Sequence, residues 1–524
     1  MKNIEPQTLA EVSFWQAQNN PDSIAFIFEN RAVTFHQFDA HANQIANGLL
    51  IENIKKESRV AYLAKDSDYG YEIFFGCVKS RSVLTPINWK LSAEEVLFIL
   101  NNSEAEILFV SKDFFSVIEE IKNKLTTVSK IIACDGNHPE WTNYMDWRSQ
   151  QKEKNIEFAY TPEDVVVQIY TSGTTGLPKG VQLSNHSFFG VIQQMKLKGD
   201  DWMSLSNQDR LLLSLPIFHI GGLWWAVQGF IVGGLGVILE TFVAWKALEI
   251  IAKNKITKIA MVPAMIQFML AEPSCKETDF SSISGLLYGG SPITPSLMRI
   301  ALETFNCDFF QVYGMTETGN MAVCLRPEDH TMPWTEKMKS AGKPLPGVMI
   351  KVIDQYNNKL SVNMIGEICI KSPANMIGYW KNEEANRSTY VDGWIYTGDA
   401  GYICQNGYVY ICDRIKDMII CAGENIYPAE IEAALSTHEL ISEVAVIGIP
   451  DEKWGEKIKA FVVLKPESTI KKRELIMFLK GKIADFKIPN SISFAPSLPR
   501  NPSGKILKRV LKEPFWKGKE RLVN

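Results

Sequence analysis

Apolar runs of strand length recur along most of this chain, and stretches with helical spacing of apolar residues separate them. Examples are RVAYLA (59–64), EILFVS (106–111), VVVQIY (165–170), KIAMVP (258–263) and DFFQVYG (308–314). Runs of this length and composition are typical of buried strands. Their alternation with helices predicts an α/β fold, with layered subdomains built on largely parallel sheets.

The pattern changes after about residue 341, where short strands are joined by Gly, Asn and Asp turns. The runs VMIKVID, EICIKS, GYICQ and GYVYIC predict a small antiparallel or barrel-like β subdomain. A compact α+β pattern follows Arg414, with the helix EIEAALST and the strands EVAVIGIP and IKAFVVL. We therefore expect a large N-terminal domain (1–414), a hinge (415–417) and a small, mobile α+β C-terminal domain (418–524).

The composition excludes several classes of protein. The 524 residues are 46% hydrophobic and 22% charged, with a formal net charge of −4, which gives no argument for a nucleic-acid partner. Nine cysteines form no C-x-x-C pair and only seven histidines accompany them, so neither a zinc site nor a disulfide framework is indicated. An odd number of thiols, and an N-terminus without the apolar core of a signal peptide, favour the cytoplasm.

One segment, residues 221–239, has the length and apolar character of a membrane span. It contains six glycines, and it has the pattern of a helix followed by that of a strand. We therefore interpret this segment as a buried element of the core.

A loop rich in glycine and hydroxyl groups follows the strand VVVQIY. The sequence YTSGTTGLPKG (170–180) contains three glycines, which let backbone N–H groups approach a ligand, and hydroxyl and lysine side chains that add donors. This composition suits a loop that wraps a polyphosphate, and a solvated turn is the alternative. It is not a Walker A loop, because the chain contains no G-x-x-x-x-G-K-[ST].

Four further segments contain residues suited to bind a nucleotide. In QVYGMTETG (311–319) an aromatic ring could stack on a purine and Glu317 could bind Mg²⁺, since hard cations take carboxylate oxygen. In GWIYTGD (393–399) the last residue is suited to accept hydrogen bonds from ribose hydroxyls. DRIKDMIICAGENIYPAEIE (413–432) combines an arginine, a glycine-rich loop and a helix begun by proline, and RNPSGK (500–505) is a basic loop. Each segment taken alone is also explained by an ordinary turn or a solvated surface.

Taken together and in this order, the five segments resemble those of the adenylate-forming enzymes, which include acyl- and aryl-CoA ligases, firefly luciferase and nonribosomal adenylation domains. The resemblance extends from RVAYLA to RNPSGKILK. The chain is most similar to bacterial fatty-acyl-CoA ligases, through INWKLSAEEVLFIL, DRLLLSLPIFH, EVAVIGIPDEKWGE and LPRNPSGKILK. Residues 65–66 are Lys-Asp where an Asn is common in the family, and the sequence alone gives this difference no functional meaning.

The resemblance implies an ATP site assembled from distant segments. Its phosphate loop, adenine loop, stacking aromatic and ribose ligands would be Thr171, Ser172, Gly173, Thr174, Thr175, Lys179, Gly289, Gly290, Ser291, Tyr313, Gly314, Asp399 and Arg414. Thr316 would hold the α-phosphate, Glu317 would bind Mg²⁺, and Lys505 would enter the site for adenylation. These three residues and His219 are the catalytic candidates.

The resemblance also implies an acyl pocket and a moving domain. The pocket residues would be His219, Gly221, Gly222, Leu223, Trp224, Gly314 and Met315, for which packing in the core is the alternative. The C-terminal domain would turn about Lys416, withdraw Lys505 and present the loop at Gly423 to coenzyme A.

The expected activity is that of an ATP-dependent carboxylic acid:CoA ligase acting on medium- or long-chain fatty acids. It would use ATP, Mg²⁺ and coenzyme A; adenylation would release pyrophosphate, and thioester formation would then release AMP. The alternative within the family is an aryl-acid or specialised-metabolite CoA ligase. The alternative from another class is a non-catalytic nucleotide- or fatty-acid-binding protein.

The expected partners are small molecules and no nucleic acid. A homodimer is the default for a soluble oligomer, and weak peripheral contact with a membrane would suit a lipid substrate. Basic residues near the C-terminus could assist such contact, although a solvated helix end is the simpler explanation: Lys508, Arg509, Lys512, Lys517, Lys519 and Arg521.

Overall fold

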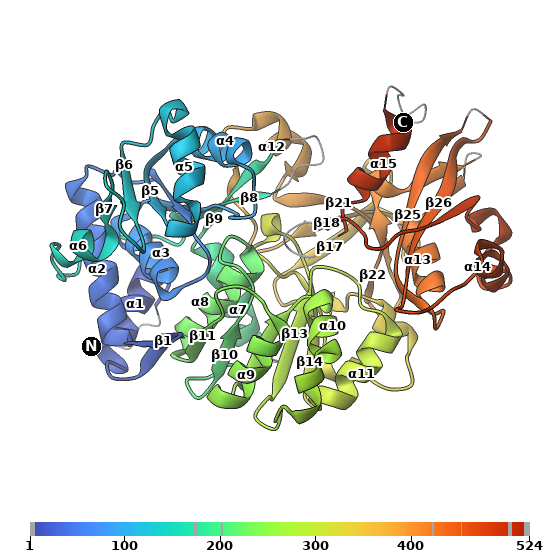
Figure 1. Ribbon diagram of the computed structural model, residues 1–524, viewed down its shortest axis with the longest axis horizontal. Coiled ribbons are helices and arrows are strands. Elements are labelled where there is room, and N and C mark those ends of the chain that lie inside the picture. The colour runs from blue at the N-terminus through green and yellow to red at the C-terminus, as the bar shows by residue number, and fades with distance from the viewer. Residues whose placement is uncertain are drawn as a thin grey trace.

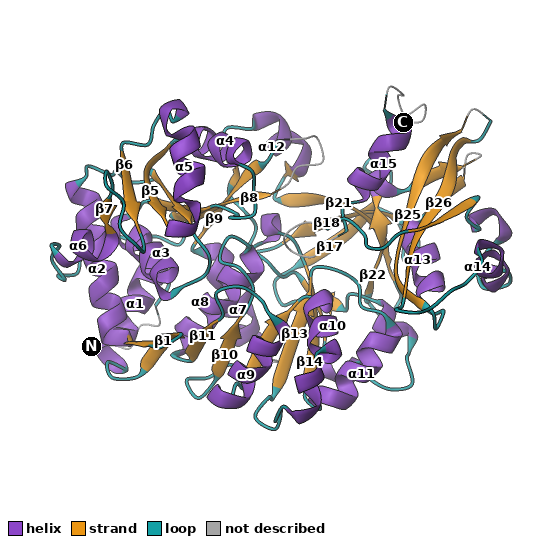
Figure 2. Cartoon of the chain, viewed as in Figure 1, coloured by secondary structure: helices purple, strands orange, loops and turns teal. Residues whose placement is uncertain are grey.

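The structure is a computed structural model that describes residues 6–171, 177–200, 203–421, 424–451, 453–500 and 506–517. In Figure 1 two large sheets and their helices form the blue-to-yellow part of the molecule, and an orange-to-red unit with the C-terminus lies beside them. Figure 2 shows helices packed along the large sheets, as the alternating pattern of the sequence predicts.

The first large sheet has eight strands in the order β19-β9-β8-β4-β3-β5-β6-β7. The strands from β8 to β7 run parallel, whereas β9 and β19 are antiparallel additions at one edge. The bounds are β3 Arg59–Leu63, β4 Val83–Pro86, β5 Ala105–Val110, β6 Lys130–Ala133, β7 Thr142–Asn143, β8 Val165–Thr171, β9 Lys179–Ser184 and β19 Gly378–Tyr379. The predicted strands RVAYLA, EILFVS and VVVQIY all lie in this sheet.

The second large sheet has nine strands in the order β16-β15-β14-β13-β12-β10-β11-β1-β2. Its central strands from β14 to β1 are parallel, and the antiparallel pairs are at the two edges. The bounds are β1 Ile24–Phe28, β2 Arg31–Thr34, β10 Arg210–Leu213, β11 Leu235–Ile238, β12 Lys258–Met261, β13 Gly285–Gly289, β14 Asp308–Tyr313, β15 Val323–Leu325 and β16 Lys343–Pro344. The predicted strands KIAMVP and DFFQVYG correspond to β12 and β14.

The helices of the two large sheets begin where the sequence carries capping signals. Thr34 and Ser92 begin α2 and α4 with capping boxes. The side chains of Gln37 and Glu95 accept a hydrogen bond from the backbone N–H of the respective cap residue. The bounds are α1 Leu9–Asn19, α2 Phe35–Ile51, α3 Asp68–Ser80, α4 Ala93–Ser103, α5 Phe115–Ile121, α6 Tyr144–Ser149, α7 His186–Lys198, α8 Ile220–Val232, α9 Ala244–Asn254, α10 Pro263–Ala271 and α11 Pro295–Phe305.

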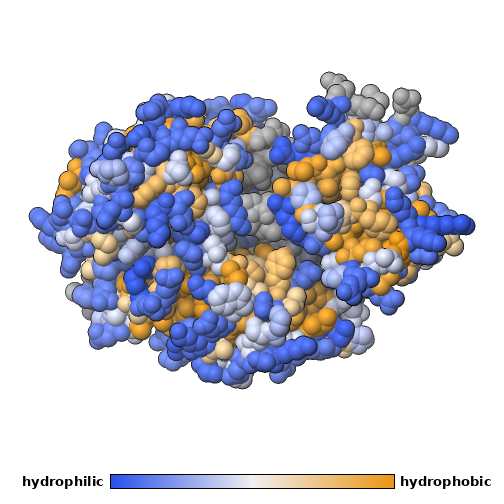
Figure 3. Space-filling model, viewed as in Figure 1, coloured by the Kyte–Doolittle hydropathy of each residue, from blue (hydrophilic) through white to orange (hydrophobic). Residues whose placement is uncertain are grey.

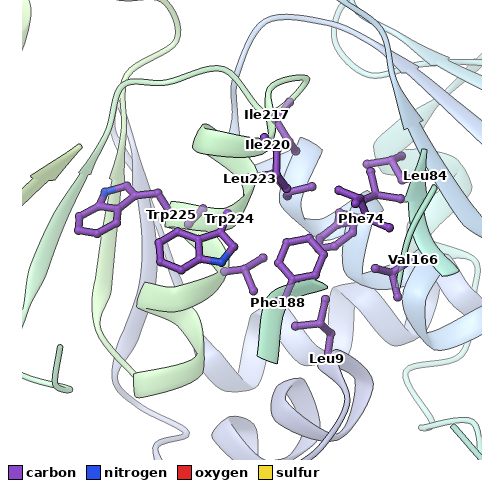
Figure 4. Packing of buried hydrophobic residues seen from close by; sticks show 14 of the residues in the cluster. Leu9, Phe74, Leu84, Val166, Phe188, Ile217, Ile220, Leu223, Trp224 and Trp225 are labelled. Atoms are coloured by element: carbon purple, nitrogen blue, oxygen red, sulfur yellow. The ribbon is translucent and has the colours of Figure 1, made fainter. Parts of the chain in front are cut away.

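The main hydrophobic core joins the two large sheets around α8. Figure 4 shows Leu223 and Trp224 of α8 near Phe188 of α7 and Leu9 of α1, with Val166 of the first sheet closing the cluster. Because the two sheets share this core, their strand ends are held in a fixed relation to each other.

The apolar segment 221–239 forms most of α8 and the strand β11, and both elements are largely buried. This confirms its interpretation as a core element. Among the described residues, no helix combines the length and the apolar character that crossing a membrane requires. On the face drawn in Figure 3, hydrophilic residues predominate, and the surface is hollowed between the large sheets and the C-terminal unit.

The region after residue 348 contains an antiparallel sheet and then the C-terminal unit, which we define as β23 to α15. The antiparallel sheet has the order β17-β18-β21-β20, with β22 paired to β21. The C-terminal unit has its own sheet and its own hydrophobic core. The bounds are β17 Met349–Ile353, β18 Gly366–Lys371, α12 Glu383–Thr389, β20 Tyr390–Val391, β21 Trp394–Ile403, β22 Val409–Arg414, β23 Ile419–Cys421, β24 Glu424–Ile426, α13 Pro428–Ser436, β25 Ile441–Asp451, β26 Gly455–Leu464, α14 Lys472–Leu479, β27 Ser491–Phe494 and α15 Lys508–Trp516.

This architecture confirms the predicted fold class, a large N-terminal part of layered α/β subdomains followed by a small C-terminal α+β unit. A 3₁₀ turn at Ile415–Asp417 joins β22 to β23. The exact division of the chain at residues 414 and 418 stays a prediction. All nine cysteines are free thiols in the structure.

Candidate functional site

The glycine-rich loop is held at both of its ends by the first sheet. Thr171 ends β8 and Lys179 begins β9, and these two residues are paired in the antiparallel ladder. The Lys179 ammonium lies 4.3 Å from the centre of the Tyr379 ring. Four of the predicted phosphate-binding residues lie outside the described residues: Ser172, Gly173, Thr174 and Thr175.

The Glu317 carboxylate is positioned by a tyrosine from the neighbouring strand. Thr316 and Glu317 are buried in a 3₁₀ turn directly after β14, and the Tyr379 hydroxyl donates to Glu317 Oε1 at 2.7 Å. The backbone of Met376 donates to the Glu317 carbonyl at 2.9 Å. Tyr379 lies on β19, which pairs with β9, so the same ring contacts the predicted metal ligand and the predicted phosphate lysine.

The Glu317 carboxylate fits the requirements of a magnesium ligand. Mg²⁺ is usually held by one or two protein carboxylates together with substrate phosphates and water, so a complete protein cage is not needed. Within the described ranges, no group of three or more His, Cys, Asp or Glu side chains could hold a metal by itself. Glu317 is 5% exposed, and a carboxylate that accepts one hydrogen bond at Oε1 keeps further acceptor capacity.

Asp399 is held between Arg414, the other predicted ribose ligand, and Tyr313, the predicted stacking aromatic. The Tyr313 hydroxyl donates to Asp399 Oδ2 at 2.7 Å, and Arg414 Nε is 2.6 Å from Asp399 Oδ1. Asp399 and Arg414 are directly opposite each other in the β21–β22 ladder, which explains why an arginine 15 residues later reaches the carboxylate. Burial raises the pKa of Tyr313, and the charge of Asp399 raises it further.

The turn that presents Asp399 depends on two groups that sequence reasoning missed. Gly398 has a φ of +69°, and its backbone N–H donates to Glu367 Oε1 at 2.9 Å. Burial raises the pKa of Glu367. The Thr397 hydroxyl accepts the Asp399 N–H at 3.0 Å and donates to the Ile368 carbonyl at 2.7 Å.

Glycines at the ends of β13 and β14 allow close backbone contact on the predicted adenine side. A Cβ on Gly289 would lie 2.5 Å from the Val312 carbonyl oxygen, and one on Gly314 would lie 2.2 Å from the Asn320 carbonyl oxygen. Gly290 has a φ of +80°, in the left-handed region that favours glycine. Ser291 follows in the same loop. These two strand ends therefore lie side by side, as the β13–β14 register also requires.

His219 precedes α8 as its N-cap residue, at the start of the predicted acyl pocket. Burial lowers its pKa to about 4, and the charge of Lys90 lowers it further, so the imidazole is neutral at physiological pH. A Cβ on Gly221 would have ordinary contacts at 3.7 Å, whereas one on Gly222 would lie 2.3 Å from the carbonyl oxygens of Leu215 and Pro216. Gly222 thus lets the first turn of α8 rest on the preceding loop.

Figure 4 shows the side chains of two neighbouring tryptophans of α8, and both are buried. Leu223 and Trp224 are buried in the core between the sheets, so their predicted place in an acyl channel stays a prediction. Trp225 faces the second large sheet, where its Nε1 donates to the Leu212 carbonyl at 3.2 Å. Met315, the other predicted pocket residue, packs against the same core.

A small apolar cavity lies on the Trp225 side of α8. Its volume is about 10 Å³, and it is lined by Met203, Leu205, Trp225, Lys258, Gly285, Leu287 and Phe310. Gly285, Leu287 and Gly289 alternate along β13 and therefore share one face of the strand. Two residues of the cavity lining and Gly289 therefore lie on the same face of β13, with Gly289 at the strand end.

The predicted hinge is enclosed by charged groups of the C-terminal unit. Lys512 Nζ is 3.0 Å from Asp417 Oδ1, and the Asp413 carboxylate accepts the backbone N–H of Ala429 at 2.8 Å. Lys508 Nζ is 2.8 Å from Glu432 Oε1. Two of the basic residues considered for membrane contact are thus engaged in ion pairs.

Burial lowers the pKa of Lys416 itself. Its role as the hinge stays a prediction. Gly423 and Lys505 lie outside the described residues.

Known proteins resemble this chain over nearly its whole length. The chain matches the family described as AMP-binding enzyme over residues 13–380 and AMP-binding enzyme C-terminal domain over residues 430–505. It is 44% identical over 519 residues to the fatty acid–[acyl-carrier-protein] ligase ScoC of Streptomyces coeruleorubidus, covering 99% of this chain and 98% of that protein.

A second relative and a solved structure extend the likeness. The chain is 34% identical to a long-chain-fatty-acid–CoA ligase of Mycobacterium tuberculosis, covering 92% of this chain and 93% of that one. The crystal structure of the anthranilate CoA ligase AuaEII with anthranoyl-AMP superimposes with a TM-score of 0.89 at 27% identity, covering 97% and 98% of the two chains. The chain therefore belongs to the adenylate-forming AMP-binding enzymes, and it is an AMP-forming acid–thiol ligase.

Proposed function

We propose that this enzyme activates a medium- or long-chain fatty acid as its acyl-AMP and transfers the acyl group to the thiol of a pantetheine arm. The observation that carries the proposal is one continuous set of contacts across the strand ends. Lys179 contacts Tyr379, Tyr379 donates to Glu317, and the turn after β14 leads back to Tyr313, which donates to Asp399. These contacts support a site in which the phosphate, metal and ribose ligands would lie along one nucleotide.

In the first step a substrate carboxylate oxygen bonds to the α-phosphorus of ATP, and the bond from that phosphorus to the pyrophosphate oxygen breaks. An anion approaches a polyanion, so the barrier is largely electrostatic, and preorganised positive groups lower it. Lys179 would hold the departing pyrophosphate, and Thr316 and Lys505 would contact the α-phosphate. A Mg²⁺ ion held by Glu317 would supply further neutralisation of the phosphate charge.

In the second step the pantetheine sulfur bonds to the acyl carbon, and the bond from that carbon to the AMP oxygen breaks. The thiol proton is lost and AMP leaves with the electron pair. Asp399 and Arg414 would retain the ribose during both steps. Rotation of the C-terminal unit about Lys416 would remove Lys505 and bring the loop at Gly423 to the acyl-adenylate.

In this proposal the alkyl chain would lie along the face of β13 that carries both Gly289 and the lining of the small cavity beside Trp225. An aliphatic substrate is supported by two relatives that are named as ligases of fatty acids. The aryl-acid alternative is supported by a 2-succinylbenzoate–CoA ligase of Bacillus velezensis, 35% identical, and by the anthranilate CoA ligase structure at 27% identity.

Coenzyme A is the acceptor expected from the sequence, and a carrier protein is the second candidate. The higher identity to a fatty acid–[acyl-carrier-protein] ligase, 44% against 34% for the CoA ligase, favours the carrier protein. Purified enzyme with ATP, Mg²⁺ and dodecanoate should be offered coenzyme A and a phosphopantetheinylated acyl carrier protein in parallel. The rate of thioester formation on each identifies the acceptor.

The proposal as a whole is tested by pyrophosphate release with a panel of acids that spans alkanoates from four to eighteen carbons and substituted benzoates. We expect the highest kcat/KM with an alkanoate of medium or long chain. If kcat/KM is higher with a benzoate than with any alkanoate, the substrate class is the aryl acids and not the fatty acids. Absence of acid-dependent pyrophosphate release with every acid would contradict the proposed ligase activity altogether.

A further inference from the structure

A carboxyl group is buried where three strand ends from the two large sheets meet. Asp66 lies just after β3 and is 5% exposed. Its Oδ1 accepts the backbone N–H of Ile217, after β10, at 2.7 Å. Its own backbone N–H donates to the carbonyl of Glu240, after β11, at 3.3 Å. Asp66 therefore links the first sheet to two loops of the second sheet.

The loop that Asp66 contacts leads directly to the proposed acyl site. Ile217 is two residues before His219, whose backbone N–H donates to the Pro216 carbonyl at 3.0 Å. The His219 carbonyl in turn accepts the backbone N–H of Gly222 at 3.0 Å, in the first turn of α8. Gly222 also packs directly on the carbonyls of Leu215 and Pro216. The loop 215–219 and the first turn of α8 thus form one closely packed piece, and a displacement of Ile217 displaces His219.

Asp66 is an unexpected residue for this position on physical grounds. Removing an ionised carboxylate from water is strongly unfavourable, and an amide could accept the same hydrogen bond without burying a charge. Residues 65–66 are also where the sequence differs from the Asn that is common in the family. Asp68, two residues later, is buried too, but Arg31 compensates it through two hydrogen bonds. Within the described part of the chain, no cationic side chain forms an ion pair with Asp66.

We propose that Asp66 is a positioning residue of the acyl half of the site, which fixes the loop 215–219 through Ile217 and so holds His219 toward the carboxylate of the acid. This inference rests on the proposed function. Asp66 does not touch the substrate. Asp66 acts through the backbone of the loop. Because a carboxyl group can ionise and an amide cannot, Asp66 also makes the site sensitive to pH.

This sensitivity is a dependence of acid binding on pH. Burial raises the pKa of Asp66 to about 8, the Ile217 N–H opposes this shift, and the charge of Glu240 adds to it. The hydroxyl groups of Tyr62 and Tyr71 also interact electrostatically with Asp66, and neither supplies positive charge.

The Lys65 ammonium is paired with Asp113 at 2.6 Å, away from Asp66. His219 is neutral in this range. Above about pH 8 a negative charge therefore develops behind the loop that faces the substrate carboxylate, and it repels that anion.

The test compares Asp66→Asn with Asp66→Leu in acid-dependent pyrophosphate release between pH 6.5 and 9.5, with separate KM values for acid and ATP. The amide keeps an acceptor for Ile217 and cannot ionise, so we expect a near-normal KM for the acid at pH 7 and no increase above pH 8. The leucine has no acceptor, and we expect a KM for the acid raised roughly tenfold at every pH, with the KM for ATP nearly unchanged. The wild-type enzyme should have the same KM for the acid as Asp66→Asn below pH 8, and a higher KM above pH 8.

Asp68→Asn is the matched control, because it neutralises a buried carboxylate that does not contact the loop. Its thermal stability should fall while the KM for the acid and its pH dependence stay as in the wild type. If Asp66→Leu does not fold, the pH profile of Asp66→Asn decides alone. Equal acid KM profiles for wild type and Asp66→Asn across the pH range would overturn the inference while leaving the ligase activity in place. Absence of pyrophosphate release from the wild type with every acid would instead remove the proposed function, and this inference with it.

Discussion

Glu317 and Glu72 are two buried carboxylates that accept a hydrogen bond from a tyrosine at the same distance, but only one is in the proposed site. The Tyr379 hydroxyl is 2.7 Å from Glu317, and the Tyr144 hydroxyl is 2.7 Å from Glu72. A hydrogen bond to a charged acceptor fixes the orientation of that carboxylate. At Glu317 the orientation would decide how the carboxylate binds a metal ion bound to phosphate. At Glu72 the carboxylate instead takes part in a buried ion pair with Arg148.

This comparison gives a prediction for Tyr379→Phe. Loss of the hydroxyl leaves the Glu317 carboxylate free to rotate, and we expect adenylation to slow by roughly ten- to a hundredfold, with a higher Mg²⁺ requirement. Pyrophosphate exchange at a series of Mg²⁺ concentrations measures both effects. Tyr144→Phe removes the matched hydroxyl and should leave the exchange rate and the Mg²⁺ requirement unchanged. If pyrophosphate exchange slows equally in both variants, Tyr379 affects the rate only through the stability of the protein.

His219 leads to a prediction about stability and pH. Its pKa in the folded protein is about 4, below the ordinary value of 6.5, so the unfolded chain binds a proton between these values that the folded chain does not. Stability should therefore fall as the pH is lowered from 7 toward 4. His330 is buried with a pKa lowered to about 4 as well, and it contributes in the same direction.

Urea unfolding at pH 7 and at pH 5 measures this dependence. From pH 7 to pH 5 the free energy of unfolding of His219→Gln should fall less than that of the wild type. The part of the fall that remains in the variant is expected from His330. An unchanged pH slope in His219→Gln would mean that the pKa of His219 is the same in the folded and unfolded protein. That result would contradict the lowered pKa of the buried imidazole.

At the scale of the element, neighbouring residues of β14 serve two different faces of the second sheet. Phe310 lines the small cavity below α8, whereas Phe309 lies in the core on the opposite face with Tyr288 and Phe305. Alternation along a strand separates the two side chains although they are adjacent in sequence. The cavity side is the one that continues to Gly289.

We predict that Phe310→Leu shifts the preferred acid to a longer chain, because the smaller side chain extends the cavity. Phe309→Leu is the matched control and should keep the wild-type preference. Both variants should lose a similar stability, on the order of 1 kcal/mol, since each is a modest change of volume in a buried position. An acid panel scored by kcat/KM for pyrophosphate release shows the shift, and equal preferences in the two variants would place the acyl chain elsewhere.

The elements themselves were largely predictable, because strands and caps are encoded locally. The runs at 59–64, 258–263 and 308–314 became strands, and the capping box at Ser92 begins α4. Contacts between distant segments were not predictable in this way. Tyr379 and Asp66 reach their partners over 62 and 151 positions, and neither lies in a motif with a recognisable spacing. Asp399 and Arg414 were found because they stand in motifs, and the ladder that pairs them was seen only in the structure.

At the scale of the whole molecule, the proposed mechanism assigns the two half-reactions to two conformations that differ by rotation about Lys416 and by the position of Lys505. Lys505→Ala should slow adenylation by roughly a hundredfold or more, since it removes positive charge from the phosphate that is attacked. Thioester formation from supplied acyl-AMP should remain close to the wild-type rate, because the lysine is expected to be withdrawn in that step. Measuring the two half-reactions separately tests the scheme, and an equal loss in both would contradict it.

The wide separation of the site residues along the chain has a consequence for protein synthesis. Tyr313 meets Asp399 86 positions later, and Arg414 follows on the next strand. A chain that emerges from the ribosome can fold its first sheets early, because domains form as their residues become available. The proposed ribose carboxylate is absent until β21 has emerged. Chains that end before β21 thus carry the glycine-rich loop without Asp399 and Arg414.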